Sequence, residues 1–93
     1  MTMIDGTRTL VLGGSGGLGS RMAAELISRG GRVLLAARDA TRLQTTATAI
    51  GGNVPSALFD LAEPHHAAHI VETAVAALGG LDGVVNAAGV VAF

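Results

Sequence analysis

The chain has 93 residues, 49% of them hydrophobic but only 2% aromatic, with a formal net charge of −1; this suits one domain over residues 1–93 with an aliphatic core. The near-neutral charge argues against nucleic acid or an anionic membrane as a partner, and the absence of cysteine excludes a disulfide framework and a thiolate metal site. Because no apolar run approaches the roughly 20 residues of a membrane span and the first residues lack the pattern of a signal peptide, we expect a cytoplasmic protein.

The first half of the chain alternates between apolar strands and amphipathic helices. Residues 7–12 predict a buried strand, and residues 32–37 predict a second one whose continuous apolar run suits burial on both faces. Between them, residues 17–29 predict a helix stopped by two glycines. Its expected apolar stripe consists of Leu18, Met22, Ala23, Leu26 and Ile27. Asp39 is placed to cap the next helix, which closes at Gly51.

The second half continues the same alternation. Residues 53–59 predict a third strand, and Pro55 near its start is typical of an edge strand. Pro64 suits the first turn of a third helix, which runs to about Leu78 and ends at two glycines. Its expected apolar side is formed by Ala67, Ile70, Val71, Ala74, Val75 and Leu78. Residues 81–86 predict a fourth strand.

This alternation predicts an α/β fold. Right-handed crossovers give a Rossmann-like open parallel sheet of order 3-2-1-4 with flanking helices, which ends after the fourth strand. Ligands of such sheets bind beyond the carboxyl ends of the strands, where the strand order reverses. The glycine-rich turn after strand 1 and residues 86–89 after strand 4 therefore flank the same expected crevice.

The glycine-rich turn, residues 13–19, reads Gly-Gly-Ser-Gly-Gly-Leu-Gly. Glycine tolerates a positive φ and allows close approach of a ligand, and a helix that begins directly after such a turn aims its free N–H groups at an anion. The turn predicts a phosphate site, most simply that of a dinucleotide, although a tight connection is the alternative. The glycine spacing fits three known patterns equally well.

Four segments together resemble the short-chain dehydrogenase/reductase family. They are the glycine turn 13–19, the strand-2 ending Ala-Ala-Arg-Asp at 36–39, Phe-Asp-Leu at 59–61, and Leu-Asp-Gly-Val-Val-Asn-Ala-Ala-Gly at 81–89. Leu12 replaces the threonine of the family's glycine motif, and Ala87 replaces the second asparagine of its Asn-Asn-Ala-Gly motif. The resemblance covers nearly the whole chain.

The resemblance implies a nicotinamide dinucleotide as cofactor and assigns roles around it. Gly13 makes the sharp exit from strand 1, Gly17 and Leu18 offer backbone beside the pyrophosphate, and Gly19 lets the helix pack close to the sheet. Ser15 is placed to donate to the adenosine ribose or its phosphate. The full set of cofactor-binding residues that it implies is Gly13, Ser15, Gly16, Gly17, Leu18, Gly19, Arg38, Asp60, Leu61, Asn86, Ala87, Ala88 and Gly89.

The remaining implied roles fall on strands 3 and 4. Asp60 would bond the adenine amino group with the Leu61 backbone alongside, and its alternative is a helix cap or turn residue. Asn86 would tie strand 4 to its neighbour, and Ala88 and Gly89 would lie beside the nicotinamide-side ribose.

The end of strand 2 predicts NADP(H), with NAD as the alternative. An NAD site needs a carboxylate on the ribose hydroxyls, and Ala37 stands at that position, followed by Arg38, whose guanidinium suits a 2′-phosphate. Against this, Asp39 could turn inward, and Gly16 stands where many NADP-dependent relatives have a second basic residue. A solvated arginine at the start of a helix is the alternative for Arg38.

Two further predictions concern what the chain does not supply. His65, His66 and His69 are interpreted as exposed helix residues and not as a metal site. The resemblance implies catalysis by a Ser, a Tyr and a Lys beyond the fourth strand, and all six basic residues of this chain are arginine, with no tyrosine. We therefore predict no catalytic residue here and activity only with a further part.

Three hypotheses follow: the cofactor half of an oxidoreductase, a stand-alone nucleotide-binding module, and an interaction protein without cofactor. In all three, strand 4 would present an open apolar edge. Such edges recruit another chain, so we expect a homo-oligomer or a partner chain near residues 83–86 and 90–93.

Overall fold

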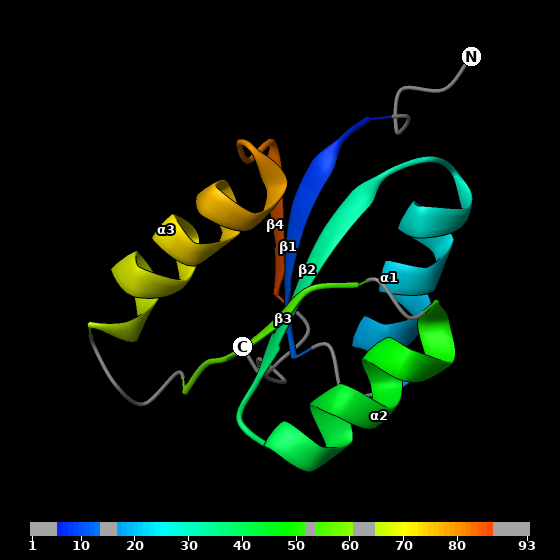
Figure 1. Ribbon diagram of the computed structural model, residues 1–93, viewed down its shortest axis with the longest axis horizontal. Coiled ribbons are helices and arrows are strands. Elements are labelled where there is room, and N and C mark those ends of the chain that lie inside the picture. The colour runs from blue at the N-terminus through cyan, green and yellow to red at the C-terminus, as the bar shows by residue number, and fades with distance from the viewer. Residues whose placement is uncertain (1–5, 14–16, 52–53, 61–64, 87–93) are drawn as a thin grey trace, which may run out of the picture.

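A computed structural model describes residues 6–13, 17–51, 54–60 and 65–86 of the chain. Strands and helices alternate along it, as the sequence predicts (Figure 1). The elements are β1 (Arg8–Leu12), α1 (Gly17–Ser28), β2 (Arg32–Ala37), α2 (Ala40–Ile50), β3 (Ser56–Leu58), α3 (His66–Leu78) and β4 (Gly83–Asn86).

The four strands form one parallel sheet in the order β3-β2-β1-β4, which confirms the predicted topology. β1 lies at the centre, where Leu10 pairs with Leu34 of β2 on one side and with Val84 of β4 on the other. The short strand β3, which Pro55 directly precedes, is an edge strand as expected. β4 forms the opposite edge of the sheet.

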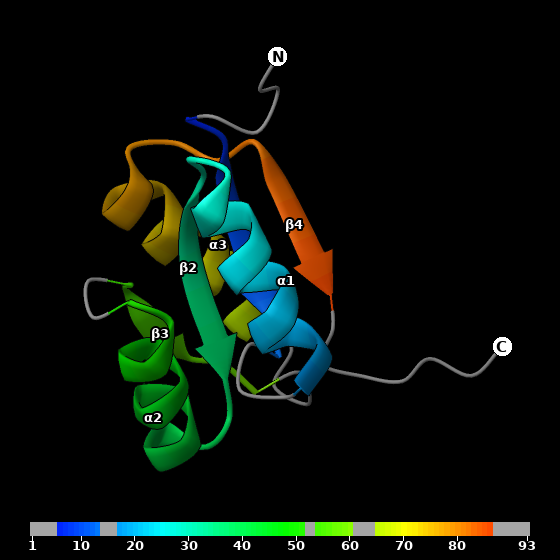
Figure 2. The same cartoon turned by 90° about the vertical axis from the view of Figure 1, so that its right-hand side faces the viewer.

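Side chains of alternating direction on the strands build two apolar layers, one on each face of the sheet. α3 covers one face, and α1 and α2 cover the other (Figures 1 and 2). The buried residues of the α3 layer are Leu10, Leu12, Leu34, Ala36, Phe59, Ile70, Ala74 and Leu78. Those of the α1–α2 layer are Val11, Ala23, Val33, Leu35, Ala37, Leu43 and Ala47.

The predicted apolar stripe of α1 is correct except at Leu18, because Met22, Leu26 and Ile27 are partly buried beside Ala23. Leu18 is 66% exposed, whereas Gly19 and Ala23 are the buried residues of this helix. Leu18 precedes Ala23 by five residues, which turns its side chain about 140° away from the sheet-facing direction at about 100° per residue. Leu18 therefore does not belong to the buried stripe, although it lies four residues before Met22.

The apolar side of α3 is narrower than predicted. Ile70, Ala74 and Leu78 are buried, but Val71 and Val75 are 40% and 44% exposed, and Ala67 is exposed as well. α3 packs chiefly against the central strands β2 and β1, and Val71 and Val75 lie about 100° around the helix from buried Ile70 and Ala74. The helix begins at His66, and Pro64 lies outside the described residues.

Candidate functional site: the carboxyl end of the sheet

The carboxyl ends of the four strands lie together, because all strands run in the same direction. Leu12 pairs with Ala36 of β2 and with Asn86 of β4, and Ala37 pairs with Leu58 of β3. The residues that follow each strand therefore gather at one end of the sheet, where α1 and α2 also begin (Figure 2). We call this the carboxyl end of the sheet.

Gly13 makes the predicted sharp exit from β1. Its φ of 81° lies in the region that favours glycine, and its backbone N donates to the Ala36 carbonyl at 2.7 Å. This hydrogen bond continues the pairing of β1 with β2 to the residue that follows Leu12.

The first turn of α1 presents backbone at the same end. Gly17 and Leu18 are exposed, and Gly19 is buried against the sheet. A Cβ added at Gly17 would meet open space, so no packing within the described structure requires glycine there. This turn carries no acidic side chain, which leaves the positive end of the helix dipole without a carboxylate of its own. Ser15 and Gly16 lie outside the described residues.

The end of β2 carries opposite charges in different settings. Ala37 is buried and offers no side-chain acceptor, while Arg38 is exposed. Asp39 is the N-cap of α2, as predicted: its Oδ1 accepts from the Arg42 backbone N at 3.1 Å. A cap of this kind satisfies one of the free N–H groups of the helix. The Asp39 carboxylate therefore serves the helix that follows it.

Asp60 and Asn86 complete the described part of this end. Phe59 is buried under α3, and its backbone N donates to the Ala37 carbonyl at 2.9 Å. This hydrogen bond fixes half-buried Asp60 beside the end of β2. Asn86 is exposed at the last position of β4, next to Leu12. The other predicted members, Leu61, Ala87, Ala88 and Gly89, lie outside the described residues.

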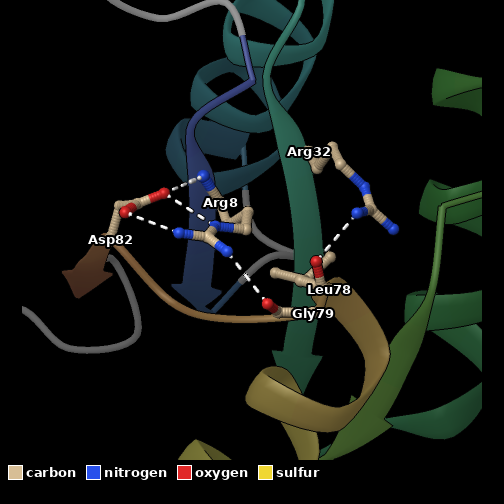
Figure 3. Close-up of polar contacts among 5 residues, drawn as sticks. All are labelled: Arg8, Arg32, Leu78, Gly79 and Asp82. Atoms are coloured by element: carbon tan, nitrogen blue, oxygen red, sulfur yellow. Dashed lines mark hydrogen bonds and ion pairs between the residues drawn. The ribbon is translucent and has the colours of Figure 1, made fainter.

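The amino end of the sheet holds a polar cluster that was not predicted (Figure 3). Arg8 donates from Nε to Asp82 Oδ2 at 2.9 Å and from Nη2 to Oδ1 at 3.1 Å, and its Nη1 reaches the Gly79 carbonyl at 2.9 Å. Arg32 donates to the Leu78 carbonyl at 2.8 Å. Two arginines thus donate to carbonyls at the carboxyl end of α3. The helix dipole favours positive charge at this end of a helix.

The Arg8–Asp82 contact also changes the titration of Asp82. Hydrogen bonds from the Arg8 side chain, and then from its backbone N, hold the pKa of Asp82 at about 2, below its ordinary value of 3.8. The same contact limits position 80, because a Cβ added at Gly80 would collide with the Arg8 guanidinium. The predicted sheet order could have indicated this pair, because Arg8 begins β1 and Asp82 directly precedes β4, the parallel neighbour of β1.

A cavity of about 440 Å³ also lies at the amino end, between the starts of β2 and β3 and the end of α3. Arg32, Pro55 and Leu78 are among its lining residues. This cavity lies at the opposite end of the sheet from Gly13. None of the predicted cofactor-binding residues lines it.

The histidines do not gather into a metal site within the described ranges. His65 and His69 are exposed at the start of α3, and no group of three His, Cys, Asp or Glu side chains that could hold a metal occurs among the described residues. Within the same ranges, no helix has the length and apolarity to cross a membrane.

Comparisons with known proteins show the family of the chain. Residues 7–93 match the family model described as short chain dehydrogenase. An uncharacterized oxidoreductase of Mycobacterium tuberculosis is 35% identical over 92 residues, which cover 96% of this chain and 35% of that protein.

Two solved structures extend the comparison. A short-chain dehydrogenase/reductase of Serratia marcescens is 35% identical with a TM-score of 0.84, over 94% of this chain and 37% of that one. A 3-ketoacyl-(acyl-carrier-protein) reductase of Brucella melitensis, solved in complex with NADH, is 25% identical with a TM-score of 0.80, over 87% of this chain and 33% of that one. The chain spans about a third of the length of these relatives.

Proposed function

Because the chain belongs to the short-chain dehydrogenase family, whose members bind nicotinamide dinucleotides, we propose that the carboxyl end of its sheet binds NADP(H) as the cofactor half of an oxidoreductase. The glycine turn would hold the pyrophosphate, and the end of β2 would hold the adenosine ribose. This proposal keeps the predicted residues and places the 2′-phosphate beside Arg38.

The observation that carries the choice of NADP(H) is the hydrogen bond from the Arg42 backbone N to Asp39 Oδ1, 3.1 Å long. A carboxylate engaged as a helix cap is a poor acceptor for the ribose hydroxyls that an NAD site must bind. Ala37 offers no carboxylate in its place, and the Arg38 guanidinium is exposed beside it. A guanidinium binds phosphate oxygens bidentately, so these three neighbours favour a 2′-phosphate.

The first turn of α1 supports a pyrophosphate site, because it leaves space beside its backbone. Gly17 borders open space, and Gly19 is buried so that the helix lies close to the sheet. Gly13, with its φ of 81°, forms a turn directly after β1. Backbone N–H groups at such a helix start are the usual partners of a pyrophosphate.

Hydride transfer would require groups that this chain does not contain. None of its 93 residues is a tyrosine, and its six basic residues are all arginines. We expect binding without turnover from this chain alone. A role as a stand-alone nucleotide-binding module fits the same binding site and differs only in having no catalytic counterpart.

The test is calorimetric titration of the chain with NADP⁺ and NAD⁺. The wild-type chain should bind NADP⁺ more tightly, and Arg38→Ala should weaken NADP⁺ binding by roughly tenfold or more while leaving NAD⁺ binding nearly unchanged. Equal affinities of the wild-type chain for the two cofactors would overturn the assignment of Arg38.

A partner at the β4 edge is a second part of the proposal. Val84 is 51% exposed on the face that α3 covers elsewhere, and Val71 and Val75 of α3 are exposed as well. An open strand edge beside an apolar patch favours pairing with another chain. We expect either a second copy or a partner subunit there.

A further inference from the structure

The six arginines of the chain divide between the two ends of the sheet. Those at the amino end all have partners: Arg8 binds Asp82, Arg29 binds Glu25 at 2.6 Å, and Arg32 binds the Leu78 carbonyl. At the carboxyl end, the side chains of Arg21, Arg38 and Arg42 make no hydrogen bond or ion pair with any residue that the structure describes.

Arg42 lies close to Arg38 through the start of α2. Asp39, between them, accepts from the Arg42 backbone N at 3.1 Å with its side chain and from the Leu43 backbone N at 2.9 Å with its carbonyl. These two bonds place Arg42 in the first turn of α2, next to the end of β2. Arg38 and Arg42 therefore lie at the same corner of the molecule, where β2 ends and α2 begins.

The direction of the Arg42 side chain follows from helix geometry. Leu43 is 3% exposed and faces the sheet, and Arg42 precedes it by one residue, or about 100° around the helix axis. This rotation is in the direction of Ile50, which belongs to the same apolar layer as Leu26 and Ile27 of α1. Thr46, one turn further along this flank, is half-buried, and α1 packs against α2.

The opposite flank of α2 differs from this one. Gln44 and Thr48 lie there, are both exposed, and contact each other at 3.5 Å. Arg42 therefore lies on the flank of α2 that is nearer to α1. Arg21 differs from it: it precedes buried Ala23 by two residues, which turns its side chain to the solvent side of α1.

We propose that Arg42 is a second specificity-determining residue, which binds the 2′-phosphate of NADP(H) together with Arg38; this inference rests on the proposed function. A phosphate monoester carries nearly two negative charges and three acceptor oxygens at neutral pH. One bidentate guanidinium satisfies two of those oxygens and one charge. Arg42, free of other partners in the described structure and facing the same corner, supplies the second cation.

The test compares three arginine variants by calorimetric titration with NADP⁺, NAD⁺ and the fragments 2′,5′-ADP and 5′-AMP. Arg42→Ala should weaken NADP⁺ and 2′,5′-ADP roughly 5- to 20-fold and leave NAD⁺ and 5′-AMP nearly unchanged. The Asp39 cap survives this substitution, because its donor is the Arg42 backbone N. Thermal unfolding of each variant monitors the fold.

Arg21→Ala is the matched control. It removes the same charge from an unpartnered arginine at the same end of the sheet, but on the solvent side of α1. A loss of NADP⁺ affinity in Arg42→Ala no larger than in Arg21→Ala would overturn the inference and leave the role of Arg38 intact. A wild-type chain that fails to prefer NADP⁺ would overturn the proposed function, and the inference with it.

Discussion

Asp39 binds the backbone of Arg42 and so belongs to the start of α2, although it lies only two residues beyond the position where an NAD site needs its carboxylate. The side chain of a residue that follows β2 can turn towards the helix or towards the crevice. In this protein the Asp39 carboxylate turns towards the helix. The exposed side chain of Arg38 supplies the charge at the end of β2. The cofactor preference proposed above depends on this single choice.

Substitution of Asp39 separates its two conceivable roles. Asp39→Ala should lower the free energy of unfolding by about 1 kcal/mol, because the α2 cap is lost, whereas Asp39→Asn should retain most of the stability, because Asn is also a good cap. Neither variant should change NAD⁺ affinity by more than about twofold. Thermal unfolding and calorimetry measure both effects. If Asp39→Asn kept its stability but bound NAD⁺ much more weakly, the carboxylate would be a ribose ligand after all.

The Arg8–Asp82 pair predicts how stability depends on pH. The pKa of Asp82 is about 2 in the folded chain, below its ordinary value of 3.8, so its contribution is fully present above pH 3.8 and is lost as the pH falls towards 2. Asp82→Asn should therefore be less stable than wild type at neutral pH, and the difference should shrink through this acidic range. Urea unfolding at a series of pH values measures it.

Glu25→Gln is the control for that experiment. It removes the carboxylate of the Arg29–Glu25 pair, whose side chains are both 60% exposed and lie one turn apart on α1. Exposed pairs of this type contribute little, so this variant should unfold nearly as the wild type does at every pH. A pH dependence unchanged by Asp82→Asn would show that the Arg8 contact does not affect folding.

The exposed edge at β4 predicts self-association or capture of a partner. Sedimentation of the wild-type chain at high micromolar concentration should show a species larger than the monomer, and Val84→Lys should shift it to the monomer, because a charge on an edge strand opposes pairing. Leu58→Lys is the control, since Leu58 is 59% exposed on β3, the opposite edge of the sheet. A wild-type chain that stays monomeric would contradict the prediction.

Topology was the most predictable feature of this protein. Short turns between strands and helices leave few arrangements once crossovers must be right-handed, and the observed order β3-β2-β1-β4 is the expected one. Asp39 was identified as a cap because the residue type and the helix start coincide. Local chemistry of this kind is written in adjacent residues.

The misplaced residues are those whose environment depends on distant parts of the chain. Leu18 and Val71 are apolar and lie at helical spacing, but their exposure is decided by which strands the helices cover. Arg8 and Asp82 meet across 74 residues of sequence, and only the pairing of β1 with β4 brings them together. The spacing of apolar residues does not predict how wide the buried face of a helix is. The type of a single residue does not indicate which distant residue it will contact.

Arg8 also restricts which sequences this fold accepts. Its guanidinium occupies the space that a side chain at position 80 would need, and Gly80 has a φ of 146° as well. That φ requires glycine at position 80 even where space is available, so positions 8 and 82 are the two that depend on each other: without a cation at position 8, Asp82 would lose its partner. Among related sequences, an acidic residue at position 82 should accompany an arginine at position 8, and this pair would record how the start of β4 is held to β1.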